Sequence, residues 1–361
     1  MQVVRVLIVD DSAVIRKVLG NMLASDPEIV VAGTAGNGHQ ALTRIPETKP
    51  DLITLDIEMP HMDGLETLVE IRKLYPKLPV IMFSTLTERG AAATLDALAR
   101  GASDYVTKPS HESADVSQER VREELLRKIK SLCAVRVPRP GPYPAARPRT
   151  ISVSTRTPAR IDVVAIGTST GGPNALTGLI PQFPADFPVP IVIVQHMPPL
   201  FTRLLAERLD SLAPLEVQEG KEGQKLQRGQ VWIAPGDYHM TVVRKEKEFV
   251  LGLNHDPQEN SCRPAVDVLF RSVAQAYGAN VLGVVLTGMG ADGTRGSAEI
   301  REAGGEVIVQ DEASSVVWGM PGSVVAANLT DCMYPLGDIV PEVMRRVSMR
   351  RTLANVARMK N

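Results

Sequence analysis

The sequence predicts two α/β domains, each built on a doubly wound parallel sheet and joined by a linker rich in proline and arginine. Short apolar segments alternate with helix-like segments in both halves of the 361-residue chain. This alternation is typical of parallel sheets that are covered by helices on both faces. Between the halves the composition changes abruptly. We therefore expect domains at residues 1–132 and 161–350, with a linker at 133–160.

The first half contains five candidate strands. Apolar residues 4–9 end at Asp10 and Asp11, and Ser12 then has the position of a helix cap, with a helix expected through about Leu23. Further strands are expected at 29–32, 52–55, 80–83 and 102–106. A charged amphipathic helix over about 121–133 is expected to close the domain.

The segment 133–160 contains six prolines, six arginines and no acidic residue. Proline fixes its own φ and favours extended geometry in the residue before it, so no helix or central strand is expected here. A solvated, semi-rigid tether is the simpler interpretation, and contact of the arginines with an anionic surface is the alternative. After this linker, strands are expected at 162–166, 190–195, 231–234, 281–286 and 306–310.

The composition excludes several classes of protein. With 40 basic and 41 acidic residues, the chain has no overall field that would favour nucleic acid or a membrane surface. Its three cysteines are scattered, which argues against a disulfide framework or a zinc cluster and fits a reducing cytosol. We find no signal-peptide pattern and no apolar run of membrane-spanning length. A cytoplasmic protein, not inserted in a membrane, is expected.

Acidic and basic residues follow the predicted strands of the first domain. Asp10 and Asp11 follow the first strand, Asp56 the third, Ser84 the fourth and Lys108 the fifth. The carboxyl ends of parallel strands meet at one edge, where open sheets bind ligands. Three carboxylates at one edge need a cation, and oxygen ligands of this kind suit Mg²⁺. A carboxylate beside Mg²⁺, a hydroxyl and a lysine is suited to accept a phosphoryl group.

This domain resembles the receiver domain of two-component response regulators, which has a flavodoxin-like fold. The resemblance is carried by the sequences LDIEMP at 55–60, MDG at 62–64 and TKP at 107–109, together with the acidic pair. It implies that Asp56 is the phosphorylated residue and that Asp10, Asp11 and Asp56 bind Mg²⁺. It further implies that the phosphate is sensed by Ser84, Lys108 and the switch aromatic Tyr105.

Three residue types suited to acyl transfer follow predicted strands of the second domain. Ser169 lies in the turn GTSTGG at 167–172, His196 directly follows the second strand, and Asp292 lies in the glycine-rich turn after a later strand. A hydroxyl, an imidazole and a carboxylate at one sheet edge can serve as nucleophile, base and orienting acid. The chain order Ser, His, Asp differs from the Ser, Asp, His order of α/β-hydrolases.

The second domain resembles the catalytic domain of chemotaxis protein-glutamate methylesterases, a Rossmann-like esterase domain. The matching sequences are GTSTGG at 167–172, QHMP at 195–198, IAPG at 233–236, RPAVD at 263–267, TGMG at 287–290 and GMP at 319–321. The resemblance implies that Ser169, His196 and Asp292 are catalytic, with Met289 and Thr170 at the oxyanion or substrate, and that the ester chemistry needs no cofactor. It implies a phosphodonor, a chemotaxis histidine kinase, and a substrate, the methylated cytoplasmic domains of chemoreceptors. Glutamine side chains of the receptors are a possible second substrate.

Three other functions remain as alternatives. A signalling adaptor would use Ser169 only as a helix cap and would not react with serine-directed phosphonates. A transcription factor is disfavoured because the second domain has no helix-turn-helix pattern and no basic face. A nucleotide-binding domain would need an acidic residue about 20 positions after the glycine-rich turn, and only Asp186 lies near there. Cys262 is either a reactive thiol or, more simply, a passive residue of the site.

Overall fold

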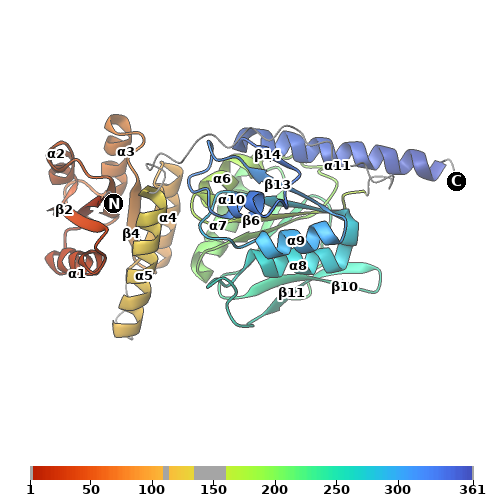
Figure 1. Cartoon of the computed structure of the whole chain (residues 1–361), viewed down its shortest axis with the longest axis horizontal. Helices are drawn as coiled ribbons and strands as arrows, with labels where there is room; N and C mark the ends of the chain where they lie inside the picture. The colour runs from red at the N-terminus through yellow and green to blue at the C-terminus, as the bar shows by residue number, and fades with distance from the viewer. Residues whose placement is uncertain (1–2, 109–113, 134–159, 360–361) are drawn as a thin grey trace.

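The computed structural model describes residues 3–108, 114–133 and 160–359 and contains two α/β domains (Figure 1). Most of the predicted linker, 133–160, lies outside the described residues, so this boundary stays a prediction. The prediction of two parallel-sheet domains is confirmed, because every strand pair in both main sheets is parallel. None of the helices described combines the length and the apolar character needed to cross a membrane.

The N-terminal domain has five strands in the order β2-β1-β3-β4-β5, which is the flavodoxin-like order. The strands are β1 (Val4–Val9), β2 (Ile29–Ala35), β3 (Leu52–Asp56), β4 (Val80–Ser84) and β5 (Asp104–Thr107). The helices are α1 (Ala13–Ala24), α2 (Gly38–Thr48), α3 (Gly64–Leu74), α4 (Glu88–Ala99) and α5 (Ala114–Cys133).

The two faces of this sheet are covered by different helices. Val6 and Ile8 of β1 belong to a core with α1 and α5, whereas Leu7 and Val9 belong to a core with α2, α3 and α4. Side chains of a strand alternate between faces, so a strand that is apolar throughout is buried on both sides. Ser12 caps α1 by accepting a hydrogen bond from the backbone N–H of Ile15, as the sequence predicts.

The C-terminal domain has a seven-stranded sheet with the order β14-β13-β12-β6-β7-β9-β8. The strands are β6 (Val163–Thr168), β7 (Ile191–Gln195), β8 (Glu216–Glu219), β9 (Gln230–Ile233), β12 (Val281–Val285), β13 (Glu306–Gln310) and β14 (Cys332–Tyr334). The helices are α6 (Gly172–Leu179), α7 (Pro199–Leu212), α8 (Val266–Tyr277), α9 (Thr294–Glu302), α10 (Met320–Ala326) and α11 (Leu336–Met359), with short 3-10 turns η3 (Ile180–Gln182) and η4 (Gly278–Asn280).

Four strands of this domain were absent from the sequence prediction. β8 and β14 are short edge strands, and β10 (His239–Lys245) and β11 (Glu248–Asn254) form a separate antiparallel hairpin beside α8. Edge and hairpin strands keep exposed polar residues, so they lack the continuous apolar signal of the central strands. The last helix also runs further than expected, to Met359, beyond the predicted domain end at 350.

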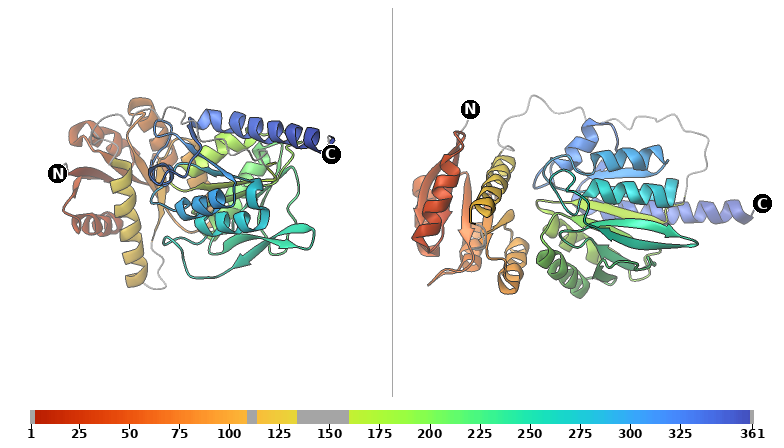
Figure 2. Two further views of the ribbon diagram at one scale, coloured as in Figure 1. Left: turned by 45° about the vertical axis from the view of Figure 1, so that its right-hand side comes forward. Right: turned by 90° about the horizontal axis from the view of Figure 1, so that it is seen from below.

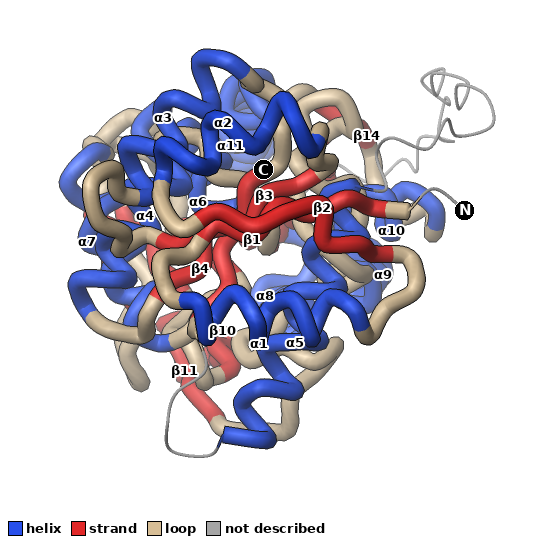
Figure 3. The backbone as a smooth tube through the Cα atoms, turned by 90° about the vertical axis from the view of Figure 1, so that its left-hand side faces the viewer, coloured by secondary structure: helices blue, strands red, loops and turns tan. Residues whose placement is uncertain are grey.

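The two domains lie side by side, with α4 and α5 of the N-terminal domain turned toward the C-terminal domain (Figure 2). Viewed from the N-terminal side, the first sheet lies in front of the elements of the second domain (Figure 3). α4 contacts both α6 and α7. Ion pairs cross this boundary from Arg203 to Glu88 at 2.8 Å and from Arg208 to Asp96 at 2.6 Å.

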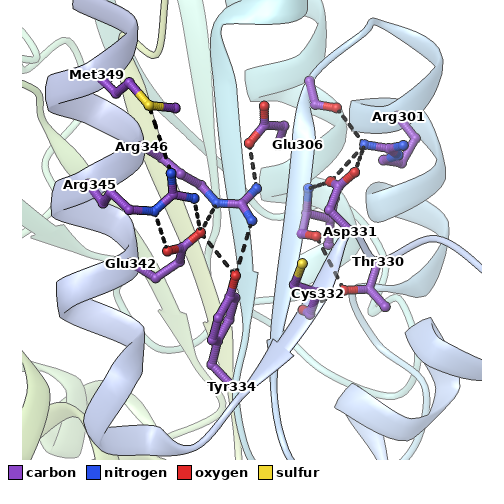
Figure 4. Close-up of polar contacts among 12 residues, drawn as sticks. Arg301, Glu306, Thr330, Asp331, Cys332, Tyr334, Glu342, Arg345, Arg346 and Met349 are labelled. Atoms are coloured by element: carbon purple, nitrogen blue, oxygen red, sulfur yellow. Dashed lines mark hydrogen bonds and ion pairs between the residues drawn. The ribbon is translucent and has the colours of Figure 1, made fainter. Parts of the chain in front are cut away.

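At the β14 edge of the second sheet, a polar network ties α11 to the sheet (Figure 4). Glu342 accepts hydrogen bonds from Arg345 at 2.7 Å, from Arg346 at 2.6 Å and from the Tyr334 hydroxyl at 3.0 Å. Arg346 also reaches Glu306 of β13 at 2.5 Å. This network fixes the first turns of α11 over the edge of the sheet.

Candidate active site and phosphorylation site

The three predicted catalytic residues lie at the carboxyl ends of adjacent strands. Ser169 follows β6, His196 follows β7 and Asp292 lies in the turn after β12, and β6 pairs with both of the other strands. The order of the strands reverses at this point, because β7 is added on one side of β6 and β12 is later added on the other side. Open α/β sheets bind their ligands at such a switch point. The fold therefore places the three residues at neighbouring strand ends.

The turn that carries Ser169 is held by backbone contacts on both sides. The Ser169 N–H donates to Thr287 O at 3.1 Å, and the Gln195 side chain donates to Ser169 O at 3.0 Å. Gly171 has a φ of +78°, and a Cβ there would lie 2.6 Å from Val316 Cγ2. Only glycine fits a position with both restrictions. The turn thus presents the Ser169 side chain in a fixed position at the end of the strand.

His196 and Asp292 are in direct contact. His196 Nε2 lies 2.8 Å from Asp292 Oδ2, and its Nδ1 lies 3.5 Å from the sulfur of Cys262. Within the described part of the chain, Ser169 Oγ has no hydrogen-bond partner. His196 and Asp292 are therefore paired, whereas among the described residues no hydrogen bond joins Ser169 to His196, and Cys262 lies beside the second imidazole nitrogen.

The electrostatics favour an ion pair between these residues. Burial by itself lowers the pKa of His196, but Cys262 and Asp292 stabilise the imidazolium more strongly, and the balance raises its pKa to about 10. Burial by itself raises the pKa of Asp292, but the hydrogen bond from His196 and two backbone N–H groups hold it below its ordinary value. The pKa of His196 is consequently held above its ordinary value while Asp292 and Cys262 are beside it.

Two backbone N–H groups at the site are available to an oxyanion. We find no hydrogen bond from the N–H of Met289 or of Thr170 to any described residue, and both residues line the cavity that contains Ser169. The cavity has a volume of about 590 Å³, and residues of both domains form its walls. Free donors beside a nucleophile suit an oxyanion hole.

The predicted acidic cluster is also assembled. One carboxylate oxygen from each of Asp10, Asp11 and Asp56 lies within 4.8 Å of the others. Lys108 Nζ lies 2.8 Å from Asp56 and 3.3 Å from Asp10. Asp10 and Asp56 are buried, and Lys108 is the cation beside both of them. A cluster of oxygen ligands with surplus negative charge fits a hard divalent cation such as Mg²⁺.

Asp56 is buried beside Lys108. Burial raises its pKa to about 6, and the ammonium of Lys108 opposes part of this rise. Ser84 is less directly placed, because its hydroxyl donates to Gly90 O at 3.1 Å instead of contacting Asp56. Tyr105 lies at the domain boundary, where its ring stacks on Phe201 at 4.6 Å. Lys108 thus contacts Asp56, whereas Ser84 contacts Gly90 and Tyr105 contacts Phe201.

Both domains of this chain match known protein families. The family model "CheB methylesterase" matches residues 164–343, and "Response regulator receiver domain" matches residues 6–117. A protein-glutamate methylesterase/protein-glutamine glutaminase from Trichodesmium erythraeum is 52% identical over 348 residues, covering 95% of this chain and 99% of the relative. This chain belongs to the CheB methylesterase family.

Other members of the CheB family support the same assignment. A protein of the same name from Pyrococcus abyssi is 43% identical, covering 98% of this chain and 96% of its own length. The crystal structure of the Thermotoga maritima CheB methylesterase catalytic domain matches with a TM-score of 0.51 and 41% identity, covering 52% of this chain and 99% of that domain. The first domain, which the receiver model matches over residues 6–117, is a receiver domain.

In this CheB chain the receiver domain reaches into the candidate active site. The hydroxyl of Thr170, next to Ser169, donates to Asp104 Oδ2 of the receiver at 2.6 Å. Asp104 is also paired with Lys128 of α5 at 3.1 Å, and Lys128 donates to Tyr105 O at 2.6 Å. Thr170 is predicted to lie at the oxyanion or substrate, and its hydroxyl is therefore hydrogen-bonded to the neighbouring domain.

Two side chains of the site were given no role in the sequence prediction. Asn260 donates to Asp292, and Asp267 lies beside it as a second buried acid. Asp267 belongs to the sequence RPAVD that the resemblance uses, but the sequence did not indicate its contact with Asn260. Asn260 lies in the loop after the unpredicted β11, where no sequence periodicity points to the active site.

Proposed function

We propose that this chain is a phosphorylation-activated esterase that hydrolyses glutamate γ-methyl esters on the cytoplasmic part of chemoreceptors. Deamidation of receptor glutamines is a second reaction of the same site, as in the names of its relatives. The observation that carries the proposal is the meeting of Ser169, His196 and Asp292 at one switch point. Because the substrate faces the cytoplasm, the enzyme works there, in chemotaxis adaptation.

In the proposed reaction, Ser169 Oγ attacks the ester carbonyl carbon and its proton passes to His196. The N–H groups of Met289 and Thr170 donate to the oxyanion, where one such donor contributes about 2.7–4 kcal/mol. Collapse of the tetrahedral intermediate breaks the bond to the methoxy group, which leaves as methanol with the proton from His196. Water then attacks the acyl-enzyme, again with His196 as base, and releases the glutamate and free Ser169.

Asp292 orients the imidazole and stabilises its charged form during both steps. Its Oδ2 is the acceptor for His196 Nε2 at 2.8 Å, so Nδ1 is the nitrogen that would face the serine. In the present arrangement Nδ1 faces Cys262. Productive chemistry therefore requires the imidazole to turn from Cys262 toward Ser169.

The receiver would control this site by covering it. Asp10, Asp11 and Asp56 would hold Mg²⁺, which neutralises charge on the oxygens of a phosphoryl group in transfer. Asp56 accepts the phosphoryl group from a chemotaxis histidine kinase, and Lys108, Ser84 and Tyr105 respond to it. Movement of Tyr105 away from Phe201 would weaken the contact between the domains. The receptor helix could then reach Ser169.

The decisive test is methanol release from methylated receptor membranes by Ser169→Ala, with folding checked by circular dichroism. We expect release at the background rate, while acetyl phosphate still labels Asp56. The double variant Ser169→Ala/His196→Ala should be little worse than the single variant, because members of a triad act as a unit. Substantial activity in a folded Ser169→Ala protein would reject the serine mechanism and favour a structural role for the turn.

A further inference from the structure

One side chain of the loop before α8 contacts two buried carboxylates. The amide nitrogen of Asn260 donates to Asp292 Oδ1 at 2.8 Å and to Asp267 Oδ2 at 2.9 Å. Asp292 is 2% exposed and Asp267 is 1% exposed, whereas Asn260 lies at the surface. An amide NH₂ group carries two hydrogens and can serve two acceptors at once. Asn260 therefore bridges two acids that water barely reaches.

The two acids need a donor between them because they carry like charge. Burial raises the pKa of Asp267, and the charge of Asp292 raises it further. Asp267 also accepts the Gly296 N–H at 2.7 Å, and Glu259, the other acid near it, is paired with Arg271 at 2.7 Å. The amide of Asn260 satisfies both carboxylates without adding a charge that would compete with the imidazolium.

The loop is shaped to deliver this amide. Glu259 and Cys262 exchange backbone hydrogen bonds at 3.2 and 2.9 Å, which closes a tight turn. The two residues inside the turn, Asn260 and Ser261, have φ values of +54° and +60°. Asparagine is among the few residues other than glycine that adopt this conformation readily. The same turn brings Cys262 to His196.

We propose that Asn260 is a positioning residue for the esterase reaction, holding Asp292 so that Oδ2 stays directed at His196. This inference rests on the proposed Ser169, His196 and Asp292 triad. Asp292 accepts backbone N–H groups from Val266, Asp267 and Gly293, and among the described residues Asn260 is the one side chain besides His196 that donates to it. It completes the set of donors on Oδ1 and leaves Oδ2 to the imidazole and one N–H.

The first test removes the amide and keeps the backbone. Asn260→Gly tolerates the positive φ, so the native turn can form without the amide, although glycine also makes the turn more flexible. We expect kcat for methanol release to fall about tenfold, with KM within about twofold, which is the effect expected when Asp292 loses one of its hydrogen bonds. Ser261→Gly is the matched control, because it adds the same flexibility to the same turn without touching a carboxylate. Equal losses in the two variants would overturn the proposal.

The second test replaces the amide by a carboxylate and includes a measurement that does not depend on turnover. Asn260→Asp keeps the shape but places a third carboxylate beside Asp292, so the His196 pKa should rise. We would follow the His196 ring by NMR in the Ser169→Ala background, and the acid limb of kcat against pH in the active enzyme. Both should move to higher pH, and wild-type titration of His196 in the Asn260→Asp variant would overturn the positioning role. Activity remaining in Ser169→Ala itself would instead reject the triad.

Discussion

The imidazole of His196 has two ring nitrogens, and Asp292, Cys262 and the proposed nucleophile Ser169 are the candidates to hydrogen-bond to them. Asp292 takes Nε2 at 2.8 Å, and Cys262 lies 3.5 Å from Nδ1, the nitrogen that the Ser169 hydroxyl would need. The contact with Cys262 also contributes to raising the His196 pKa to about 10. A general base works best when its pKa is near the working pH. Cys262 therefore opposes catalysis in this arrangement.

Cys262→Ala should lower the pH at which the enzyme reaches half of its maximal activity. Without the sulfur, the protonated imidazole loses one of its two stabilising partners, so the His196 pKa falls toward its ordinary value. We expect the acid limb of kcat to move down by about one unit or more. The measurement is methanol release between pH 6 and pH 10, with Cys332→Ala, an exposed cysteine, as control. An unchanged profile would exclude an effect of Cys262 on the base.

The sequence predicted these functional residues unevenly, and the reason is their position relative to strands. Ser169, His196 and Asp292 follow central apolar strands, whose ends must meet at one edge of a parallel sheet. Asn260 and the His196–Cys262 contact come from a loop after a hairpin, and no periodic pattern fixes where such a loop folds. Their roles depend on the tertiary structure.

At the scale of elements, the attachment of α11 to the sheet rests on buried charges. Glu342 is 8% exposed and receives hydrogen bonds from Arg345, Arg346 and Tyr334 (Figure 4). The hydrogen bond from Arg345, with the contribution of Arg346, lowers the Glu342 pKa to about 2. A pKa below the unfolded value means that the ionised carboxylate stabilises the fold. This stabilisation is complete above about pH 4.5 and is lost as the pH falls toward 2.

Glu342→Gln should destabilise the C-terminal domain by about 2–3 kcal/mol at pH 7, because the buried Arg346 loses one of its two charged partners and keeps only Glu306. The difference from wild type in urea unfolding should shrink as the pH is lowered below about 4.5. Glu248→Gln is the control, since its ion pair with Lys225 is exposed and should contribute less than about 1 kcal/mol. A constant difference at all pH values would contradict the pKa assignment.

The elements themselves were predicted according to their burial. β6, β7 and β12 are buried at every residue, which produces the apolar runs that the sequence shows. By contrast, β14 is exposed or half-buried throughout, and β10 carries exposed residues over its second half. Edge strands of this kind are defined by pairing with a neighbour, which a single segment of sequence does not reveal.

At the scale of the whole molecule, control depends on phosphorylation of one domain and chemistry in the other. Asp56→Asn should abolish labelling by acetyl phosphate and Mg²⁺, and it should leave the basal methanol release unchanged. The acceptor oxygen is lost, but the docked arrangement of the domains is not. The control is Glu70→Gln, because Glu70 is a partly exposed carboxylate on α3 that is paired with Lys73. Labelling of the Asp56→Asn protein at the wild-type rate would reject the assignment of the phosphorylated residue.

The contact between Asp104 and Thr170 leads to the last prediction. The Thr170 hydroxyl donates to a buried receiver carboxylate beside the proposed nucleophile, and a hydrogen bond to a charged group contributes about 1.5–3 kcal/mol. Asp104→Asn weakens this bond and the pairing with Lys128, so the domains should separate more often. Methanol release without phosphodonor should rise about tenfold or more, since about 1.4 kcal/mol changes an equilibrium tenfold.

Asp96→Asn is the matched control for this prediction, because it breaks another contact across the same boundary. Its ion pair with Arg208 is partly exposed, with the Asp96 side chain 48% exposed, so the basal rate should change less than about threefold. With acetyl phosphate, the wild-type protein and both variants should reach the same maximal rate, since their active sites are identical once uncovered. A basal rate in Asp104→Asn equal to that of wild type would mean that this contact does not hold the enzyme inactive. Inhibition would then have to come from the apolar contact of Tyr105 with Phe201.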